Sequence, residues 1–365
     1  MTLIILIFSI FYIAIILLFT IGVIFIKAPN SSKKHFISII VAARNEEKYL
    51  ENLLKILTTQ NYENYEVIIA NDRSTDSTQL IIENFHKRNP NRLKFVTILE
   101  ESKDFIGKKN ALNEAIKKSS GEILAFTDAD CVPSRNWLNE INRMYEKDVD
   151  IVAGYSPLIS QKNCKFLNLI KNLERSSVFA VTAGSFFWKW GITCTARNFS
   201  YRKSLFEKCN GFQSIAHIRS GDDDLMLQKI SGKSHKMKFM FSQDSIVPSY
   251  DKDDIKSQIS LETRRGSKWK YYTPAIKILS LLIMLYYLSL TLAAFFAIFN
   301  KEYLVLFLYS FLAKTLSEFL LIFIFLYRIK RLNQMYVFPF AELLYIPYFI
   351  FFGIKGTFGK YKWKN

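Results

Sequence analysis

Residues 122–131 read EILAFTDADC, an apolar run that ends in two carboxylates, those of Asp128 and Asp130. A short apolar run bounded by polar segments is typical of a buried strand. The run predicts a strand over residues 122–130, in which the side chains of Asp128 and Asp130 point to the same side and repel each other unless a cation or a proton lies between them. The pair therefore indicates either a site for Mg²⁺ or Mn²⁺, which prefer oxygen ligands, or a solvated turn in which Asp130 or Ser134 caps the next helix.

The same kind of strand recurs along the chain, separated by amphipathic segments. Apolar runs at residues 36–43, 65–72, 93–100 and 150–158 predict four more strands, with helices between them. Unbroken apolar strands that alternate with helices are typical of a mostly parallel sheet with flanking helices on both faces. We therefore expect an α/β fold. No Gly-x-Gly-x-x-Gly follows the first strand and the sequence has no P-loop, which argues against a dinucleotide-binding fold and against an NTPase.

Long apolar runs at both ends of the chain predict transmembrane helices. Residues 3–26 contain no charged side chain and are long enough to cross a bilayer. Because this run has no basic n-region and no small-x-small cleavage site after it, we interpret it as a retained anchor and not as a signal peptide. Further runs at 278–299, 303–327 and 337–354 predict two or three C-terminal spans, since the prolines and the glutamate of the last run also suit a segment that lies in the interface or re-enters.

The chain is therefore expected to have four parts. They are an N-terminal transmembrane anchor at 1–27, a linker at 28–35, a soluble domain at 36–272 and a C-terminal membrane region at 273–365. Lysines and arginines flank the apolar runs, and basic residues in this position mark the cytoplasmic side and attract anionic lipid. We expect a multi-pass protein of the cell membrane whose soluble domain is cytoplasmic.

The net charge of +17 is better explained by the membrane than by nucleic acid. The basic residues are scattered through the soluble domain or gathered at the membrane edges, without a clustered basic face that carries interleaved aromatic side chains. The four cysteines and four histidines show no metal-ligand spacing, which argues against a zinc site. In a cytoplasmic domain the cysteines are expected to be free thiols.

Polar clusters follow three of the predicted strands. Residues 42–47 read AARNEE, Asp72 stands between Asn71 and Arg73, and the aspartate pair follows the run at 122–126. Ligands of open α/β sheets bind at the carboxyl ends of the strands, so we expect these clusters to line one edge of the sheet. Asp72 can accept a hydrogen bond from an imino N–H such as that of a uracil ring, or it can form an Asx turn or a helix cap.

Three consecutive aspartates, residues 222–224, precede the apolar side of a short predicted helix. Acidic side chains suit the first turn of a helix because of its dipole, which is a purely structural explanation. Three in a row in a basic protein exceed what a cap requires, and one of them can act as the general base for a substrate hydroxyl.

The order of these segments resembles that of the inverting family 2 glycosyltransferases, which have a GT-A fold. The resemblance covers roughly the soluble domain, and each segment is weak alone, whereas five in the same order are specific. The segments are SIIVAARNEEKYLENLL (38–54), EVIIANDRSTDST (66–78), FTDADC (126–131), ARNFSYRKSLFEKCNGF (196–212) and GDDDL (221–225).

The resemblance implies a role for each matching residue. Asp222 would be the catalytic base, and Asp128 and Asp130 would bind Mg²⁺ or Mn²⁺ on the diphosphate of a nucleotide sugar. The residues expected to bind the nucleotide sugar are Ala42, Arg44, Glu46, Asp72, Lys108, Asp128 and Arg264. Among these, Lys108 and Arg264 would balance the charge of the leaving diphosphate.

Two departures from the family pattern bear on the activity. Gly221 stands where the family usually has Glu, and LETRRGSKW (261–269) lacks the Gln and the Trp of the Gln-x-x-Arg-Trp segment of processive members. The second departure argues against polymer synthesis. We expect an inverting transfer of a sugar from a nucleotide sugar, such as a UDP-sugar, to a hydroxyl of a lipid or a lipid-linked acceptor. The alternatives are a processive polysaccharide synthase and, from another class, an inactive membrane scaffold or subunit.

Lys314 and Glu318 stand four residues apart within the apolar run at 303–327. Isolated charges inside a membrane are costly. We therefore expect the two side chains to pair on one face of a helix and to face other spans and not lipid.

Overall fold

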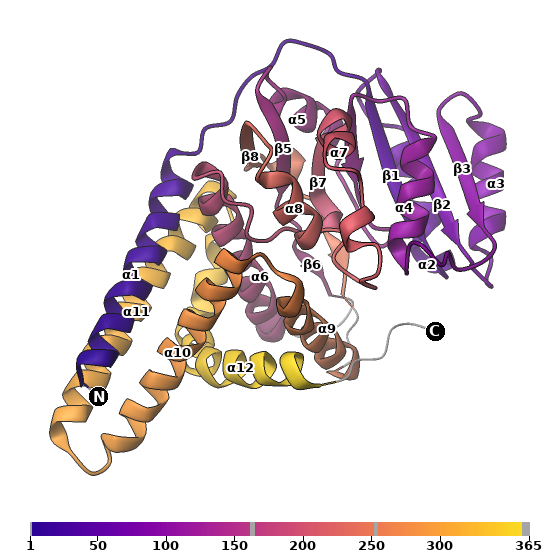
Figure 1. Cartoon of the computed structure of the whole chain (residues 1–365). Coiled ribbons are helices and arrows are strands. Elements are labelled where there is room, and N and C mark those ends of the chain that lie inside the picture. The colour runs from indigo at the N-terminus through magenta and orange to yellow at the C-terminus, as the bar shows by residue number, and fades with distance from the viewer. Residues whose placement is uncertain (1, 161–164, 252–254, 360–365) are drawn as a thin grey trace. The chain divides into compact units, whose positions relative to one another are not determined.

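The computed structural model of the chain describes residues 2–160, 165–251 and 255–359, which belong to two compact units. We call residues 26–159 and 185–251 the sheet unit, and residues 1–25, 160–184 and 252–365 the helical unit. Figure 1 labels the helices of both units and most strands of the sheet unit.

The sheet unit is built on a seven-stranded sheet with the order β3-β2-β1-β4-β7-β5-β8. Its strands are β1 (Ile37–Ala43), β2 (Tyr65–Asp72), β3 (Leu93–Ile98), β4 (Ile123–Phe126), β5 (Val149–Gly154), β7 (Phe199–Arg202) and β8 (Lys236–Met240). β3, β2, β1 and β4 are parallel to one another, and β7 runs antiparallel between β4 and β5. β6 (Leu158–Ile159) and β9 (Ser249–Tyr250) form a separate two-stranded sheet. The mostly parallel sheet confirms the predicted fold class.

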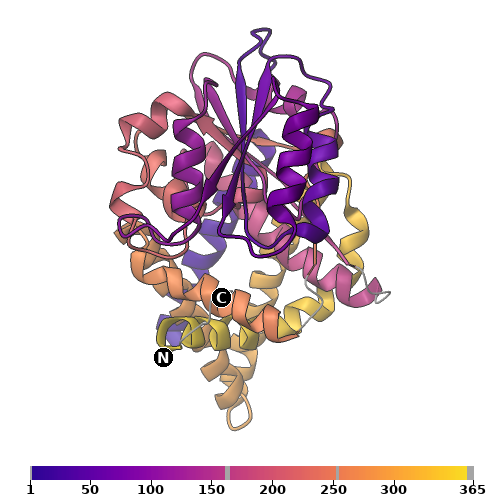
Figure 2. The ribbon, with the colours of Figure 1, turned by 90° about the vertical axis from the view of Figure 1, so that its right-hand side faces the viewer.

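Helices cover both faces of this sheet, as Figure 2 shows. They are α2 (Glu47–Leu57), α3 (Thr78–Arg88), α4 (Lys108–Lys117), α5 (Trp137–Met144), α7 (Lys203–Lys208) and α8 (Asp224–Ser231). α4 packs against β1, β2 and β3. α2 buries its leucines at the spacing of one helix face, Leu50, Leu53, Leu54 and Leu57. Amphipathic helices of this kind bury the apolar strands that the sequence revealed.

The strand that precedes the aspartate pair is shorter than predicted. β4 ends at Phe126, so Asp128 and Asp130 lie beyond it, and the expectation that a strand directs both to one side is wrong. The chain turns after the strand, with Cys131 N donating to Asp128 O at 3.1 Å. It then pairs outside the main sheet, because Tyr250 N donates to Asp130 O at 3.0 Å.

β7 is a strand that the apolar pattern did not predict. It is four residues long and enters between β4 and β5 from the distant segment 199–202. Arg202 attaches it to the beginning of β5, donating from Nε to Val149 O at 2.8 Å and from Nη2 to Glu146 O at 2.7 Å. Because Phe199 pairs with Phe126, the turn that precedes β7 lies beside the chain that leaves β4.

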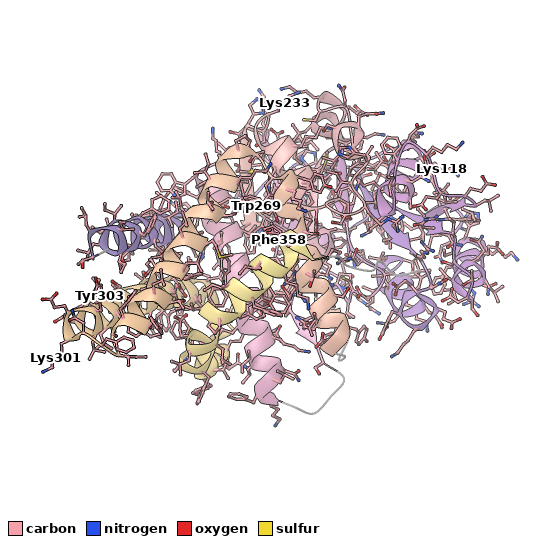
Figure 3. The ribbon with its side chains drawn as sticks, turned by 60° about the horizontal axis from the view of Figure 1, so that its bottom comes forward. Lys118, Lys233, Trp269, Lys301, Tyr303 and Phe358 are labelled. Carbon is pink, nitrogen blue, oxygen red and sulfur yellow. The ribbon has the colours of Figure 1, made fainter. Side chains whose placement is uncertain are left out.

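The helical unit is formed mainly by helices. They are α1 (Thr2–Phe25), most of α6 (Lys165–Phe187), α9 (Ile255–Ser267), α10 (Pro274–Phe296), α11 (Lys301–Arg328) and α12 (Phe338–Phe358). α1 packs along α10 and α11, and α12 packs on α9 and α10. Figure 3 shows Lys301 and Tyr303 at the end of the α10–α11 hairpin.

Four helices among the described residues are long and apolar enough to cross a membrane. They are Thr2–Phe25, Pro274–Phe296, Lys301–Arg328 and Leu332–Phe358. They coincide with the four apolar runs of the sequence, which confirms the expectation of apolar helices at both ends of the chain.

Lys314 lies in a buried ionic cluster of the helical unit. Its Nζ lies 2.9 Å from Glu318 Oε1 on the same helix and 2.7 Å from Glu342 Oε2 on α12. The Tyr12 hydroxyl of α1 donates to Glu318 Oε1 at 2.5 Å. The Lys314 side chain is 0% exposed, so the predicted pair is confirmed and faces other helices. The sequence did not reveal Glu342 as the third member, because it does not show which face of α12 meets α11.

The cluster holds one cation between two carboxylates. Loss of the cation is therefore expected to lower the free energy of unfolding more than loss of one carboxylate. Lys314→Met leaves Glu318 and Glu342 without their counter-ion. We expect it to lower the free energy of unfolding by roughly 3–5 kcal/mol, as for other buried charges that lose a partner. Glu342→Gln keeps the Lys314–Glu318 pair and is expected to cost less.

Thermal unfolding of the full chain in detergent measures both changes. Lys301→Met, at an exposed residue of α11, is the control for the loss of a lysine. Equal destabilisation by Lys314→Met and Glu342→Gln would contradict the charge-balance argument.

Candidate active site

The loops that follow β1 and β2 are joined at one edge of the sheet. The two strands are parallel, so both loops leave at the same edge. Asn45 N donates to Ser74 Oγ at 3.0 Å, and Asn45 Oδ1 accepts from Thr75 N at 2.8 Å. Asn45 has φ 53°, a left-handed conformation that Asn tolerates better than most residues. These bonds hold the predicted nucleotide-binding turn against the segment that follows Asp72.

Asp72 is the last residue of β2, and its side chain is buried. Arg73 Nε donates to Asp72 Oδ1 at 2.8 Å, and Arg73 Nη1 lies 3.3 Å from Glu101 Oε2. The next helix has Ser77 as its N-cap, so Asp72 does not cap it. Asp72 is thus a buried carboxylate at the edge where parallel sheets bind ligands.

Lys108 brings two of the predicted site residues together. Its Nζ lies 2.5 Å from Asp128 Oδ1 and 3.4 Å from Asp222 Oδ2. Lys108 begins α4, Asp128 follows β4 and Asp222 precedes α8, so this contact joins three distant parts of the sequence. The side chains of Lys108, Asp128 and Asp222 are 24%, 29% and 14% exposed, which leaves each of them partly open to a ligand.

The charges of this group stabilise one another. Burial alone would lower the pKa of Lys108, but the carboxylates of Asp128 and Asp222 raise it above its usual range. Burial alone would raise the pKa of Asp128, but the positive charges of Lys108 and Arg197 lower it below its ordinary value. Lys108 is therefore cationic and Asp128 anionic at neutral pH. Partly exposed cations of this kind form strong hydrogen bonds to phosphate oxygens.

Arg197 is a second cation beside Asp128, and the sequence analysis did not single it out. Its Nε lies 3.5 Å from Asp128 Oδ2. The next residue, Asn198, anchors the turn, because its Nδ2 donates to Ser245 O at 2.7 Å and its Oδ1 accepts from Trp137 Nε1 at 3.0 Å. The segment 196–212 was recognised from the sequence, but its pattern does not show which side chain faces the end of β4.

The three consecutive aspartates have three different environments. Asp223 is the N-cap of α8, and its Oδ1 accepts from Asp224 N at 2.7 Å. Asp224 is the first residue of the helix and is 3% exposed. Asp222 instead contacts Lys108. Gly221, just before it, has φ 90°, a conformation that L residues rarely adopt, which accounts for a glycine where the family usually has Glu.

The hydroxyl of Tyr201, on β7, is buried and has no hydrogen-bond partner in the described part of the chain. Burial, and then the negative charge of Asp222, raises the pKa of this phenol. Buried polar groups are usually paired, so this unpaired hydroxyl is an exception.

The carboxylates after β4 offer the ligands that a divalent ion requires. Among the described residues no three His, Cys, Asp or Glu side chains gather as a metal site. Mg²⁺ and Mn²⁺ are commonly held by one or two carboxylates, with water and substrate phosphates completing the shell. Asp128 and Asp130 are both partly exposed, and as hard oxygen donors they fit such an ion.

The other predicted site residues lie in two places. Ala42 is in β1, Arg44 and Glu46 follow it in the turn held by Asn45, and Glu46 N donates to Thr78 Oγ1 at 2.9 Å. Arg264 lies on α9 in the helical unit. Their contacts with a nucleotide sugar stay predictions. Of the predicted free thiols, Cys131 and Cys209 are free, and Cys164 lies outside the described residues.

Comparison with known proteins agrees with this arrangement. Residues 38–209 match the family model "Glycosyl transferase family 2". Residues 38–209 therefore form a domain of this family. An uncharacterized glycosyltransferase of Haemophilus influenzae is 34% identical over 130 residues, which are 35% of this chain and 39% of that protein. The family predicted from the five sequence segments is thus confirmed.

Other relatives of this family 2 glycosyltransferase are more fully named. A beta-monoglucosyldiacylglycerol synthase of a Nostoc species is 32% identical over 134 residues, which are 35% of this chain and 28% of that protein. The matches therefore span less than half the length of both curated relatives. The mannosyltransferase PcManGT of Pyrobaculum calidifontis, solved in complex with GDP-Man and Mn²⁺, is similar over 98% of this chain and 99% of its own, with a TM-score of 0.55 and 17% identity. This similarity confirms the predicted GT-A fold.

We predict that Asp128 and Asp130 are both needed for metal-dependent nucleotide binding. Asp128→Asn and Asp130→Asn each remove one carboxylate, and we expect each to weaken Mn²⁺ binding in the presence of UDP by at least about 10-fold, because a divalent ion here has few protein ligands. The electron paramagnetic resonance signal of free Mn²⁺ measures the affinity directly. Asp148→Asn, before β5 at the opposite edge of the sheet, is the control. Mn²⁺ affinity that is unchanged in both site variants would contradict the metal assignment.

Proposed function

We propose that this glycosyltransferase moves a sugar, with inversion, from a nucleotide sugar to a hydroxyl of a lipid or lipid-linked acceptor. The observation that carries the proposal is the contact of Lys108 with both Asp128 and Asp222. A cation suited to a diphosphate lies here between two carboxylates, Asp128, which can hold a metal ion, and Asp222, which can take up a proton. A donor and a base are therefore within reach of one reacting centre.

The nucleotide sugar binds along the edge of the sheet. Asp72 accepts the imino N–H of uracil, which favours a UDP-sugar, and Lys108 and Arg197 contact the diphosphate oxygens. Both cations already lie beside Asp128, at 2.5 Å and 3.5 Å. A Mg²⁺ or Mn²⁺ ion held by Asp128 and Asp130 would neutralise the charge of the leaving nucleoside diphosphate. Ala42, Arg44 and Glu46 line the nucleotide end of the site in this proposal, and Arg264 gives further charge to the diphosphate.

Asp222 takes the proton of the acceptor. As the acceptor oxygen forms a bond to the anomeric carbon, the bond from that carbon to the diphosphate oxygen breaks, and the hydroxyl proton passes to the Asp222 carboxylate. The electron pair of the broken bond leaves with the nucleoside diphosphate. A single displacement inverts the anomeric centre and requires no carboxylate nucleophile, in contrast to retaining chemistry.

The acceptor is proposed to reach this site from the membrane. Four helices of the chain are apolar enough to span a bilayer, and a curated relative is named for a diacylglycerol glycolipid. The basic residues that flank the apolar runs support a cytoplasmic position for the sheet unit. A lipid or lipid-linked hydroxyl is the acceptor that a membrane-bound transferase meets at this surface.

A panel of nucleotide sugars tests the proposed function. Membranes that contain the full chain are incubated with UDP-glucose, UDP-GlcNAc or GDP-mannose, with Mn²⁺ or with a chelator, and the lipid extract is analysed by mass spectrometry. The proposal predicts Mn²⁺-dependent addition of one sugar to a lipid from a UDP-sugar. A ladder of polymer would support a polysaccharide synthase instead. No turnover of any donor, with intact folding, would support an inactive scaffold.

We predict that Asp222 is the base and that Asp223 and Asp224 are not. Asp222→Asn cannot accept the proton, so transfer is expected to fall by about 10²–10⁴-fold while UDP affinity is retained. Asp223→Asn is expected to be mild, because asparagine also caps a helix and can accept from Asp224 N. Asp224→Asn is expected to be intermediate, since this side chain is buried at the beginning of α8.

Transfer rate and UDP affinity are measured side by side for these three variants. A larger loss of transfer rate from Asp223→Asn than from Asp222→Asn would show that Asp222 is not the base.

A further inference from the structure

Lys109, the residue after Lys108, is a buried lysine. It lies in the first turn of α4 and is 1% exposed, so it faces away from the partly open group around Lys108. Successive residues of a helix point about 100° apart, which separates the two adjacent lysines into different environments. Lysine is almost never fully buried unless it has partners. The position of Lys109 therefore calls for a physical explanation.

The ammonium of Lys109 donates to the backbone of the segment that leads to Asp222. Its Nζ donates to Ile218 O and, at 3.1 Å, to Ser220 O. Asp222 follows only two residues after Ser220. Hydrogen bonds from a charged donor are stronger than those between neutral groups, and they are strongest away from water. One side chain of α4 thus fixes two carbonyl groups just before the proposed base.

Two backbone contacts join the same two segments. Ile106 N donates to Ala216 O at 3.0 Å. Gly107 has φ 71°, and a Cβ at this position would lie 2.9 Å from Arg219 O. The close approach of the two chains therefore requires a glycine. Residues 106, 107 and 109 thus approach the backbone of residues 216, 218, 219 and 220.

This arrangement couples the two partners of Lys108. Lys108 Nζ lies 2.5 Å from Asp128 Oδ1, which ties the beginning of α4 to the end of β4. Lys109 ties the same helical turn to the segment before Asp222. The distance between Asp128 and Asp222 is thus set through consecutive residues of one helix.

We propose that Lys109 is a positioning residue that holds residues 216–222 in place, so that Asp222 meets the acceptor hydroxyl at the correct distance from the donor. The inference rests on the proposed function in its assignment of Asp222 as the base. We call the hydrogen bonds from Lys109 to Ile218 O and Ser220 O the clamp. The clamp is a property of the chain and can be measured without substrate.

The first experiment measures amide hydrogen exchange of the full chain in detergent. Lys109→Met keeps an apolar stem of similar length but removes the donor, and exchange in residues 216–222 is expected to rise by about 10-fold or more through local opening. Exchange in β1 and β2 and the temperature of unfolding are expected to change little. Lys118→Met is the matched control, because Lys118 is an exposed lysine at the C-terminal end of the same helix that also donates to a backbone carbonyl, Phe95 O, at 3.1 Å.

A second variant disturbs the packing of the same two segments through the backbone of Gly107 and Arg219. Gly107→Ala places a methyl group against Arg219 O and is expected to raise exchange in residues 216–222 as Lys109→Met does. Lys109→Arg keeps a cationic donor and is expected to lose less of the protection. Unchanged exchange in both Lys109→Met and Gly107→Ala would overturn the clamp, and so would a rise spread over the whole sheet unit with a general loss of stability.

The second experiment tests the link to the reaction. With the donor that the nucleotide-sugar panel identifies, Lys109→Met is expected to lower kcat by about 10–100-fold, since small displacements of a catalytic group have effects of this size. The affinity for UDP in the presence of Mn²⁺ is expected to stay within about 2-fold, since Lys108 and Asp128 are not altered. Local opening with an unchanged kcat, or a parallel loss of UDP affinity, would overturn the positioning role. If the wild type turns over no donor, the proposed function fails, whereas the exchange data still test the clamp.

Discussion

The contact between Lys108 and Asp128 can form only if the end of β4 and the beginning of α4 reach the same edge of the sheet. Parallel strands β3, β2, β1 and β4 meet this condition, because each returns to the sheet in the same direction and ends at the same edge. The antiparallel strand β7 then brings a turn with Arg197 to the same place from the opposite direction. Two cations and a carboxylate gather there although they are distant in the sequence. Asp222 lies beside this ion-paired centre, 3.4 Å from Lys108 Nζ.

Much of the sheet unit could be predicted from the sequence, because its strands are buried on both faces and read as unbroken apolar runs. The prediction of strands failed where tertiary contacts override the local sequence pattern. β4 ends at Phe126 because the following residues pair with the segment around Tyr250, and no local pattern indicates that partner. β7 is short and is held by Arg202 through backbone carbonyls of another segment. The site residues with matching motifs could be named, whereas Arg197 and Lys109 could not, because helix phase and turn geometry decide where they point.

The helical unit shows the same limit for charges within apolar helices. The i, i+4 spacing of Lys314 and Glu318 predicted their pairing, since it depends on the geometry of one helix alone. The contact with Glu342 depends on how α12 packs, and the hydrogen bond from Tyr12 depends on α1. Three apolar helices, α1, α11 and α12, thus share polar contacts that composition alone does not assign. A glutamate that argues against a span in the sequence becomes compatible with one once a lysine of a neighbouring helix pairs with it.

Lys109 and Lys314 are both buried lysines, and their different partners explain why they have different structural roles. Lys314 lies between two carboxylates, which compensate its charge, and its environment is a packed junction of helices. Lys109 donates to neutral carbonyl groups of a single segment, so its bonds constrain the backbone of that segment directly. Carbonyl groups keep a fixed direction from the chain, whereas carboxylates sit on side chains that can rotate. A lysine that grips backbone carbonyls is therefore suited to holding a loop in one conformation, and here the loop is the one that carries Asp222 to the cation of the neighbouring residue, Lys108.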